Sequence, residues 1–195
     1  MGFDIVLGPL EGINEHYEES EAFFDHCLAK FDAVNQHLAS LGLPPHNEPR
    51  PPDEGYVLLG SGRGVIEFMI AVAGISDEIE ERFDQVSIAG LGNLFIPVAL
   101  PASADLVLPD GEYFSVGSAG ALLMQCLYLM NLQDEEPIFV LDEGLRRAHE
   151  QGYRPLPDVP GDRHSELAEL DLGGAHTLSG AAAGALTLGQ SVYIY

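Results

Sequence analysis

The sequence predicts a mixed α/β or α+β fold, with helices packed on one mixed sheet and a long amphipathic helix near the N-terminus. Three observations support this fold class. Segments with strand composition alternate with helical segments along most of the chain, Pro109-Asp110-Gly111 gives a hairpin signal, and apolar residues recur at helical spacing in the first 42 residues. The length of 195 residues and the hydrophobic content of 46% suit one folded domain, so we expect residues 1–195 to form a single domain.

The N-terminal segment is expected to hold one strand and one long helix. Phe3 to Leu7 has the composition of a short strand. From about Ile13 to Leu41 the pattern predicts a helix, with one apolar stripe made of Phe24, Cys27, Phe31, Val34, Leu38 and Leu41. Gly42 is expected to end this helix.

A proline-rich connector follows the helix. Residues 43–55 contain five prolines, which make the segment stiff and exposed. The connector separates an N-terminal strand and helix, residues 1–42, from the main body, residues 56–195. Because 42 residues are too few for a core of their own, we expect the first part to dock on the second.

The main body is predicted to alternate between strands and helices. The expected strands are Tyr56–Leu59, Val86–Ala89, Leu94–Leu100, Leu106–Leu108, Tyr113–Val116, Pro137–Leu141 and Gln190–Tyr195. The expected helices are Asp77–Asp84 with Ser76 as its N-cap, a buried helix from Ser118 to Leu132, Asp142–Gln151 and Ser165–Leu170. The apolar segment Val65–Ala73 and the Gly/Ala-rich segment Gly173–Gly189 are compatible with either type of structure.

Charge is the most unusual property of the sequence. Eight basic residues stand against 31 acidic ones, which gives a formal net charge of −23. Such a surface repels nucleic acid phosphates and anionic membranes, because both are bound through Lys and Arg. It attracts basic proteins, with an association that weakens as salt rises. We therefore expect a basic protein partner, no nucleic acid and no membrane, although a role in solubility or salt adaptation alone also explains the charge.

Two acidic patches are the candidate partner-binding residues. One consists of Asp77, Glu78, Glu80, Glu81 and Asp84, and the other of Asp134, Glu135 and Glu136. The first functional hypothesis is therefore an acidic binding or inhibitor-type protein that captures a basic protein. In general character this is how immunity-type proteins and nucleic acid mimics act.

A glycine loop supports a second hypothesis. Gly60, Ser61, Gly62, Arg63 and Gly64 follow a predicted strand, so backbone N–H groups and the Arg63 guanidinium can bind a phosphate there. The spacing G-x-G-x-G differs from the dinucleotide-binding pattern and from the P-loop, and the alternative is a tight turn that needs positive φ. On this hypothesis the chain is a small enzyme or a nucleotide- or phosphate-binding protein.

A third hypothesis is a structural assembly subunit. The apolar helix Ser118–Leu132 and the final strand Val192–Tyr195 are surfaces that a second copy of the chain can cover. A homo-oligomer is therefore compatible with the sequence.

No catalytic motif is evident, and neither a cofactor nor a metal site is predicted. Cys27 and Cys126 lie among apolar residues, which indicates buried, inert thiols and a reducing, cytoplasmic location. The alternative is one disulfide between them. The histidines do not stand four residues apart on a helix, and His164, Glu166, Glu169 and Asp171 are expected to form a solvated helix face. Neither a secretory signal nor a membrane-spanning stretch is expected.

Overall fold

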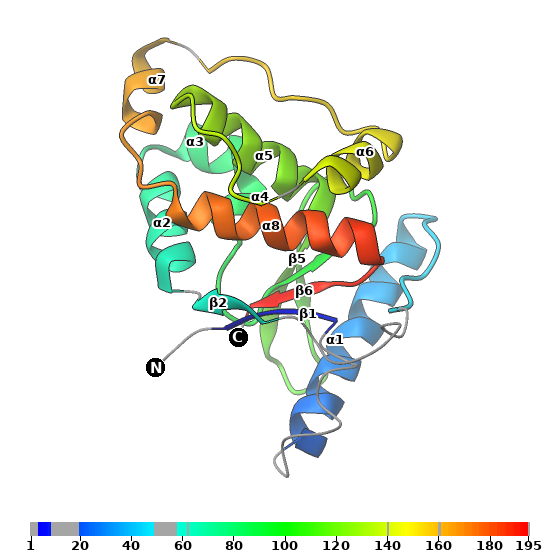
Figure 1. The fold of residues 1–195 in the computed structure, drawn as a ribbon. Helices are drawn as coiled ribbons and strands as arrows, with labels where there is room; N and C mark the ends of the chain where they lie inside the picture. Colours follow the sequence, from blue (N-terminus) through cyan, green and yellow to red (C-terminus); the bar gives the residue numbers. More distant parts are fainter. Residues whose placement is uncertain are drawn as a thin grey trace.

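The computed structural model describes residues 4–8, 20–48, 58–61, 63–139, 141–159 and 161–194. Within these residues six strands form one sheet, in the order β2-β1-β6-β3-β5-β4 (Figure 1). Their bounds are β1 Asp4–Leu7, β2 Leu58–Ser61, β3 Leu94–Ile96, β4 Ala104–Val107, β5 Tyr113–Ser118 and β6 Val192–Ile194. β3 and β5 are parallel, and the other pairs are antiparallel. The predicted mixed sheet with helices packed on it is confirmed.

Helices cover both faces of this sheet. The described helices are α1 Ser20–Ser40, α2 Arg63–Ala73, α3 Asp77–Arg82, α4 Asp84–Ser87, α5 Ala119–Leu132, α6 Asp142–Glu150, α7 Gly161–Leu167 and α8 Gly173–Leu188. α1 packs against one face, whereas α5 and α8 pack against each other and against the opposite face, with α2 and α6 beside α8 (Figure 1). The described residues therefore form three layers with an apolar core on each side of the sheet.

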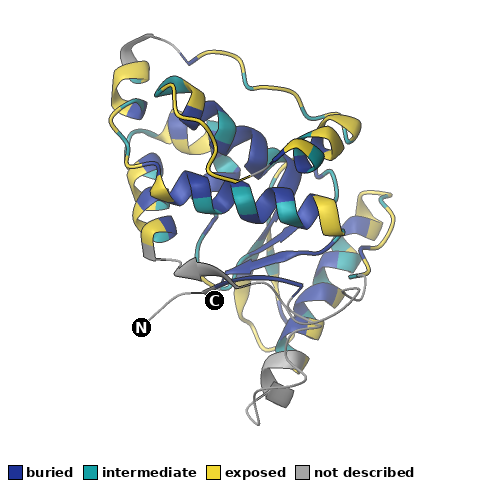
Figure 2. Ribbon diagram, in the orientation of Figure 1, coloured by how far each residue is buried: buried dark blue, intermediate teal, exposed yellow. Residues whose placement is uncertain are grey.

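Alternating side chains of the central strands supply both cores. In β3, Leu94 and Ile96 face α1, whereas Phe95 faces the layer of α5 and α8. In β6, Tyr193 faces α1, and the residues on either side of it face the opposite layer. Both strands are buried along their whole length (Figure 2). Covering on both faces explains why these strands have continuous apolar sequences without polar alternation.

Helix α1 buries most of the predicted apolar stripe. The buried members are Cys27, Phe31, Val34 and Leu38. The predicted start near Ile13 lies outside the described residues, and the helix is described from Ser20 onward. Leu41, which the periodicity placed on the stripe, lies beyond the helix and is exposed, because the chain turns at Gly42 with a φ of +70°.

Two predicted strands are wrong. Residues 86–89 contain the end of α4 and a turn, because Gln125 Oε1 accepts the backbone N–H groups of Gln85 and Val86 and fixes the start of that helix. Residues 137–139 are not a strand either, because Phe139 packs against α8 instead of pairing with the sheet. A Cβ atom built on Gly180 of α8 would lie 2.6 Å from the Phe139 ring.

The two segments that the sequence pattern assigned to neither helix nor strand, Val65–Ala73 and Gly173–Gly189, are helical and belong to α2 and α8. The small residues of α8 allow close packing: a Cβ atom on Gly144 of α6 would lie 2.5 Å from Ala183 Cα. The strand at the C-terminus, β6, lies in the middle of the sheet between β1 and β3, and α5 is buried under α8. The surfaces that the assembly hypothesis assigned to a second copy are therefore covered by the chain itself.

A buried lysine fixes α1 to the sheet. The Lys30 side chain is fully buried and its Nζ donates to Gly92 O at 2.6 Å and to the Tyr193 hydroxyl at 3.3 Å. The ammonium also lies 5.1 Å from the centre of the Phe114 ring and 3.5 Å from Glu112 Oε1. Burial lowers the pKa of Lys30, and the carboxylate of Glu112 acts in the opposite direction. Lys30 therefore has a lower pKa in the folded protein than in the unfolded chain.

The Lys30→Met variant tests this contribution. Between the lowered pKa of Lys30 and its ordinary value of 10.5, the unfolded chain binds more protons at this position than the folded protein, so the unfolding free energy rises with pH. We expect this part of the rise to disappear in Lys30→Met, as measured by chemical denaturation at a series of alkaline pH values. The exposed Arg154 provides the control, since Arg154→Met should keep the wild-type slope. Equal slopes in wild type and Lys30→Met would contradict the assignment.

Candidate functional site

One edge of the sheet concentrates polar side chains. β1 and β3 are both antiparallel to β6, and β5 is parallel to β3, so β1, β3 and β5 run in the same direction. Their last residues, Leu7, Ile96 and Ser118, lie at one edge, which we call the carboxyl edge. Ligands of sheets with parallel strands commonly bind outside this edge. A ligand site is therefore expected at the carboxyl edge.

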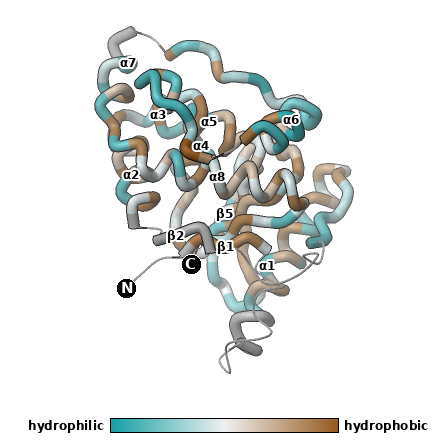
Figure 3. Tube along the Cα trace, in the orientation of Figure 1, coloured by the Kyte–Doolittle hydropathy of each residue, from teal (hydrophilic) through white to brown (hydrophobic). Residues whose placement is uncertain are grey.

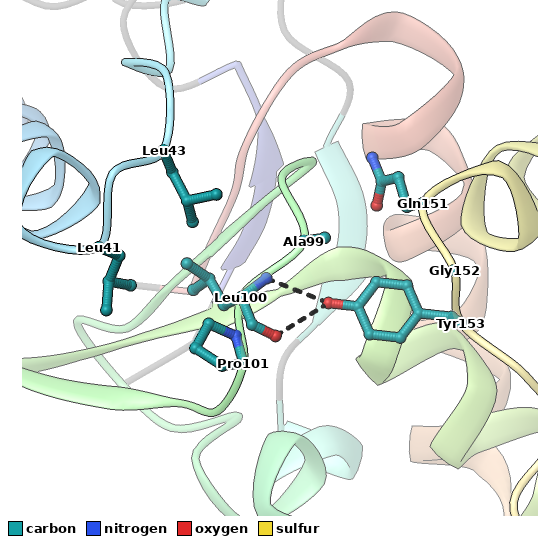
Figure 4. Close-up of a pocket in the computed structure, with 8 residues that line it drawn as sticks. All are labelled: Leu41, Leu43, Ala99, Leu100, Pro101, Gln151, Gly152 and Tyr153. Carbon is teal, nitrogen blue, oxygen red and sulfur yellow. Dashed lines mark hydrogen bonds between the residues drawn. The ribbon is translucent and has the colours of Figure 1, made fainter.

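An open groove of about 440 Å³ lies at the carboxyl edge. Its lining residues are Leu41, Leu43, Ala99, Leu100, Pro101, Gln151, Gly152 and Tyr153. Leu41 and Leu43 form one side, Gln151 and Tyr153 form the other, and Leu100 lies between them (Figure 4). The groove is thus mainly apolar, with two polar side chains on one wall.

Tyr153 closes the inner wall of the groove. Its hydroxyl accepts from Leu100 N–H at 3.2 Å and lies 2.6 Å from Ser118 Oγ and 3.3 Å from Leu100 O. Burial raises the pKa of Tyr153, so the phenol is neutral at physiological pH. The ring lies over Gly120, where a Cβ atom would approach it to 2.5 Å. The phenol thereby joins the loop after β3 to the start of α5.

Sequence reasoning missed the role of the glutamines behind this wall. Gln85 Oε1 accepts the backbone N–H of Ser118 at 2.8 Å, and Gln125 Nε2 donates to Asp84 Oδ1 at 2.8 Å. Asp84 Oδ2 also accepts the backbone N–H of Ser103 at 3.3 Å. A glutamine within an apolar helical run, as at position 125, is the sequence signal that points to such buried hydrogen bonds.

A second polar cluster lies at the same edge, in front of β6. His46 Nε2 is 2.9 Å from Ser191 Oγ, and Glu48 Oε1 accepts Ser191 N–H at 2.5 Å. The imidazole is also 3.9 Å from Glu48 Oε1, and the backbone of His46 is held by Asn35 through two hydrogen bonds. Glu48 Oε2 is buried and has no hydrogen-bond partner among the described residues.

The cluster of Ser191, His46 and Glu48 is built from the residue types of a nucleophile and its base. Ser191 is fully buried, however, and the side chains of His46 and Glu48 are exposed by only 5% and 2%. A serine in this position cannot meet a substrate without a change in the surrounding structure. In the described conformation the cluster therefore acts as a polar clamp that holds the segment before Pro49 against α1 and β6.

The residues of the glycine loop lie away from the carboxyl edge groove. Gly60 and Ser61 belong to β2, Gly62 lies outside the described residues, and Arg63 and Gly64 begin α2. The strand-to-helix arrangement that the phosphate hypothesis requires is thus present. Nothing lies within 4 Å of a Cβ atom built on Gly64.

The two acidic patches belong to one end of the molecule. Gln133 Nε2, in the turn after α5, donates to Leu167 O and Leu170 O at the end of α7. Arg82 of α3 donates to Pro157 O, in the segment that leads to α7, and its guanidinium lies 5.6 Å from the Tyr128 ring of α5. α3, the turn 133–136 and residues 157–159 and 161–171 therefore gather at one end (Figures 1 and 3), which we call the acidic end.

Nine carboxylates of the acidic end are exposed and form no ion pair with a described residue: Asp77, Glu78, Glu80, Glu81, Asp134, Glu136, Asp158, Glu169 and Asp171. Glu135 instead lies 2.8 Å from His176 Nε2, and Glu166 pairs with Arg163. Asp84, the last residue of the first patch, is half-buried and used in the hydrogen bonds behind the groove. It is therefore less available to a partner than the other patch residues.

The cysteines and histidines show no reactive arrangement within the described part of the chain. Cys27 and Cys126 are free and buried, and burial raises the pKa of Cys27 to about 12. Among the described residues, no three His, Cys, Asp or Glu side chains come together as a metal site. Within the same residues, no helix has both the length and the apolarity needed to cross a bilayer.

The Tyr153→Phe variant tests the inner wall of the groove. Loss of the hydroxyl leaves Leu100 N–H and Ser118 Oγ without this partner, so we expect the unfolding free energy to fall by about 1–2 kcal/mol. The measurement is chemical denaturation near neutral pH. Tyr113, which is 75% exposed, is the matched control, and Tyr113→Phe should leave stability unchanged. Equal stability of the two variants would show that the Tyr153 hydroxyl does not join these elements.

Comparison of the chain with protein-family models, with curated proteins and with solved structures gives no match. The function is therefore argued from the charge distribution and the surface geometry of this chain.

Proposed function

We propose that this protein captures a basic protein partner through the acidic end. The observation that carries the proposal is the set of nine exposed carboxylates, defined above, that have no ion-pair partner among the described residues. They come from three segments that are far apart in the sequence and are brought together by the contacts of Gln133 and Arg82.

The described cations near the acidic end do not neutralise its nine carboxylates. Arg82 is directed toward a backbone carbonyl and an aromatic ring, and Arg163 is paired with Glu166 on its own helix. The excess negative charge is therefore exposed to solvent. Such a surface raises the local concentration of a positively charged partner and increases its association rate, and salt weakens both effects.

The groove at the carboxyl edge is compatible with this role. The Tyr153 hydroxyl and Gln151 Nε2 already bond within the chain, whereas Gln151 Oε1 has no partner among the described residues. The open side of the groove is lined by Leu41, Leu43 and Pro101. It can accept an apolar side chain or a small neutral group. Within the described residues, neither an exposed nucleophile nor an acid–base pair lines it.

Charge reversal at the acidic end tests the proposal. The partner is first isolated from the native lysate at low ionic strength, identified and purified. We expect Glu81→Lys/Glu136→Lys to reduce its association rate at least about tenfold at low salt and to flatten its salt dependence. The control is Asp25→Lys/Asp32→Lys, which changes the net charge equally but lies on α1, on the opposite face of the sheet.

The control variant should keep most of the wild-type rate. If both variants lose the same amount, the net charge of the whole molecule attracts the partner and the acidic end has no special role. If no basic protein is recovered at low salt, the proposal is wrong.

A second proposal is that the Gly60–Gly64 segment binds a phosphate group. It is favoured by the passage of β2 into α2 at Arg63 and by the open space beside Gly64. We expect ATP or inorganic phosphate to raise the melting temperature, and Arg63→Ala to abolish the shift. Arg154→Ala, which removes a cation elsewhere, should retain it. Absence of a shift with both probes would exclude this proposal.

A further inference from the structure

The strand β4 leaves one edge of the described sheet open. Among the described residues it is the last strand in the order and pairs only with β5. Leu108 N–H donates to Glu112 O at 2.8 Å, and antiparallel ladders alternate between bonded and non-bonded pairs. Leu106 and Ala104 are therefore bonded to β5, whereas the backbone N–H and C=O groups of Asp105 and Val107 point toward the open edge.

The same hairpin exposes an apolar pair on one face. Val107 and Tyr113 are directly opposite each other in the register, and they are 52% and 75% exposed. On the other face Leu106 and Phe114 pack under α1. The helix layer of α5 and α8 does not cover this part of the sheet, so β4 carries exposed positions (Figure 2). Tyrosine with a neighbouring aliphatic residue is a common anchor in protein interfaces.

Acidic side chains lie on both faces of this hairpin: Asp105 shares the face of Val107, whereas Glu112 approaches Lys30 of α1 on the other face. Asp105, Asp110 and Glu112 are exposed along the hairpin. Lys30 Nζ and His26 Nε2 both approach the same carboxylate oxygen, Glu112 Oε1, at 3.5 Å. Asp105 accepts from the hydroxyl of Ser115 at 2.6 Å and forms no ion pair with a side chain that the structure describes. The open edge therefore combines unpaired backbone groups, an apolar anchor and negative charge.

We propose that the edge of β4 accepts an extended segment of the basic partner as an additional strand. This inference rests on the proposed function, because it concerns the same partner. The backbone groups of Asp105 and Val107 would pair with the added segment, its basic residues would meet Asp105 and the hairpin carboxylates, and its apolar residues would contact Val107 and Tyr113. The free backbone groups of β4 favour an extended segment, and the charge of Asp105 favours one with basic side chains.

A basic segment fits this edge better than a second copy of the chain. Each copy has a net charge of −23, and two β4 strands side by side would bring their Asp105 carboxylates near each other. Charged residues on edge strands oppose pairing between copies in this way. Dimer formation through β4 is therefore an alternative that the experiment must be able to detect.

The test uses a synthetic peptide of about eight residues in which Arg and Val take turns at every second position, with Ser between them, so that both kinds of side chain fall on the face of Asp105 and Val107. We expect it to bind at low salt and to slow the hydrogen exchange of the Asp105 and Val107 amides. The same peptide with alternate backbone nitrogens methylated keeps its charge but loses its donors, and should bind at least about tenfold more weakly.

Val107→Pro removes a backbone donor at the open edge without removing a hydrogen bond to β5. We expect at least about tenfold weaker peptide binding in this variant. Tyr113→Ser, which removes the exposed anchor and leaves the backbone intact, should also weaken binding and serves if Val107→Pro does not fold. Asp32→Asn, on the opposite face, is the control and should bind like wild type.

Protection of Asp105 and Val107 together with loss of binding in the two hairpin variants would support the inference. Equal binding of the methylated peptide, or protection confined to the acidic end, would overturn it. A dimer that sedimentation detects in the wild type and that is absent in Val107→Pro would also overturn it. If the natural partner binds Val107→Pro and Tyr113→Ser normally but fails to bind Glu81→Lys/Glu136→Lys, the edge inference is wrong and the proposed function stands.

Discussion

The insertion of β6 between β1 and β3 is the interaction on which the described fold depends. β6 joins the N-terminal pair β1–β2 to the group β3–β5–β4. No other described strand pairs with both groups. The strand is buried on both faces, so its three residues must all be apolar or amphipathic: Tyr193 meets α1 and Lys30, while Val192 and Ile194 meet α5 and α8. The order of the strands also decides what is exposed, because it leaves β4 and β2 at the edges of the sheet.

The same topology gathers the buried polar groups at the carboxyl edge. The backbone N–H groups of Ser191, just before β6, and Ser118, at the end of β5, donate to side-chain oxygens from other segments, Glu48 Oε1 and Gln85 Oε1. These bonds satisfy backbone groups where strands end and no ladder continues. The polar side chains at this edge are thus engaged in holding loops together, and the groove beside them is left with an apolar surface.

The sequence predicted those features that depend on neighbouring residues and missed those that depend on contacts between residues far apart in the chain. The capping of α3 by Ser76, the hairpin turn with Gly111 at a φ of +91° and the apolar face of α1 are local, and the sequence pattern shows them. The helical nature of 84–87 depends on Gln125, about forty residues away, and no local pattern contains that information. The gathering of the two acidic patches is non-local in the same sense, since it requires Gln133 and Arg82 to contact segments near residues 157–170. Composition identified the charged residues, but only the fold places them at one end.

The placement of the described cations is the observation that favours the proposed capture of a basic partner over acidity that serves solubility alone. All six cationic side chains whose placement is described are engaged within the chain: Lys30 is buried in the core, Arg82 and Arg154 bond to backbone carbonyls, and Arg146, Arg147 and Arg163 pair with glutamates on their own helices. None of these cations pairs with a carboxylate of α3 or with Asp134 or Glu136. Solubility requires only a net charge far from zero and is indifferent to its distribution. Every described cation is thus bonded within the chain, whereas carboxylates from three separate segments lie close together without a described ion-pair partner. This asymmetry of charge is what recognition of a positively charged partner requires.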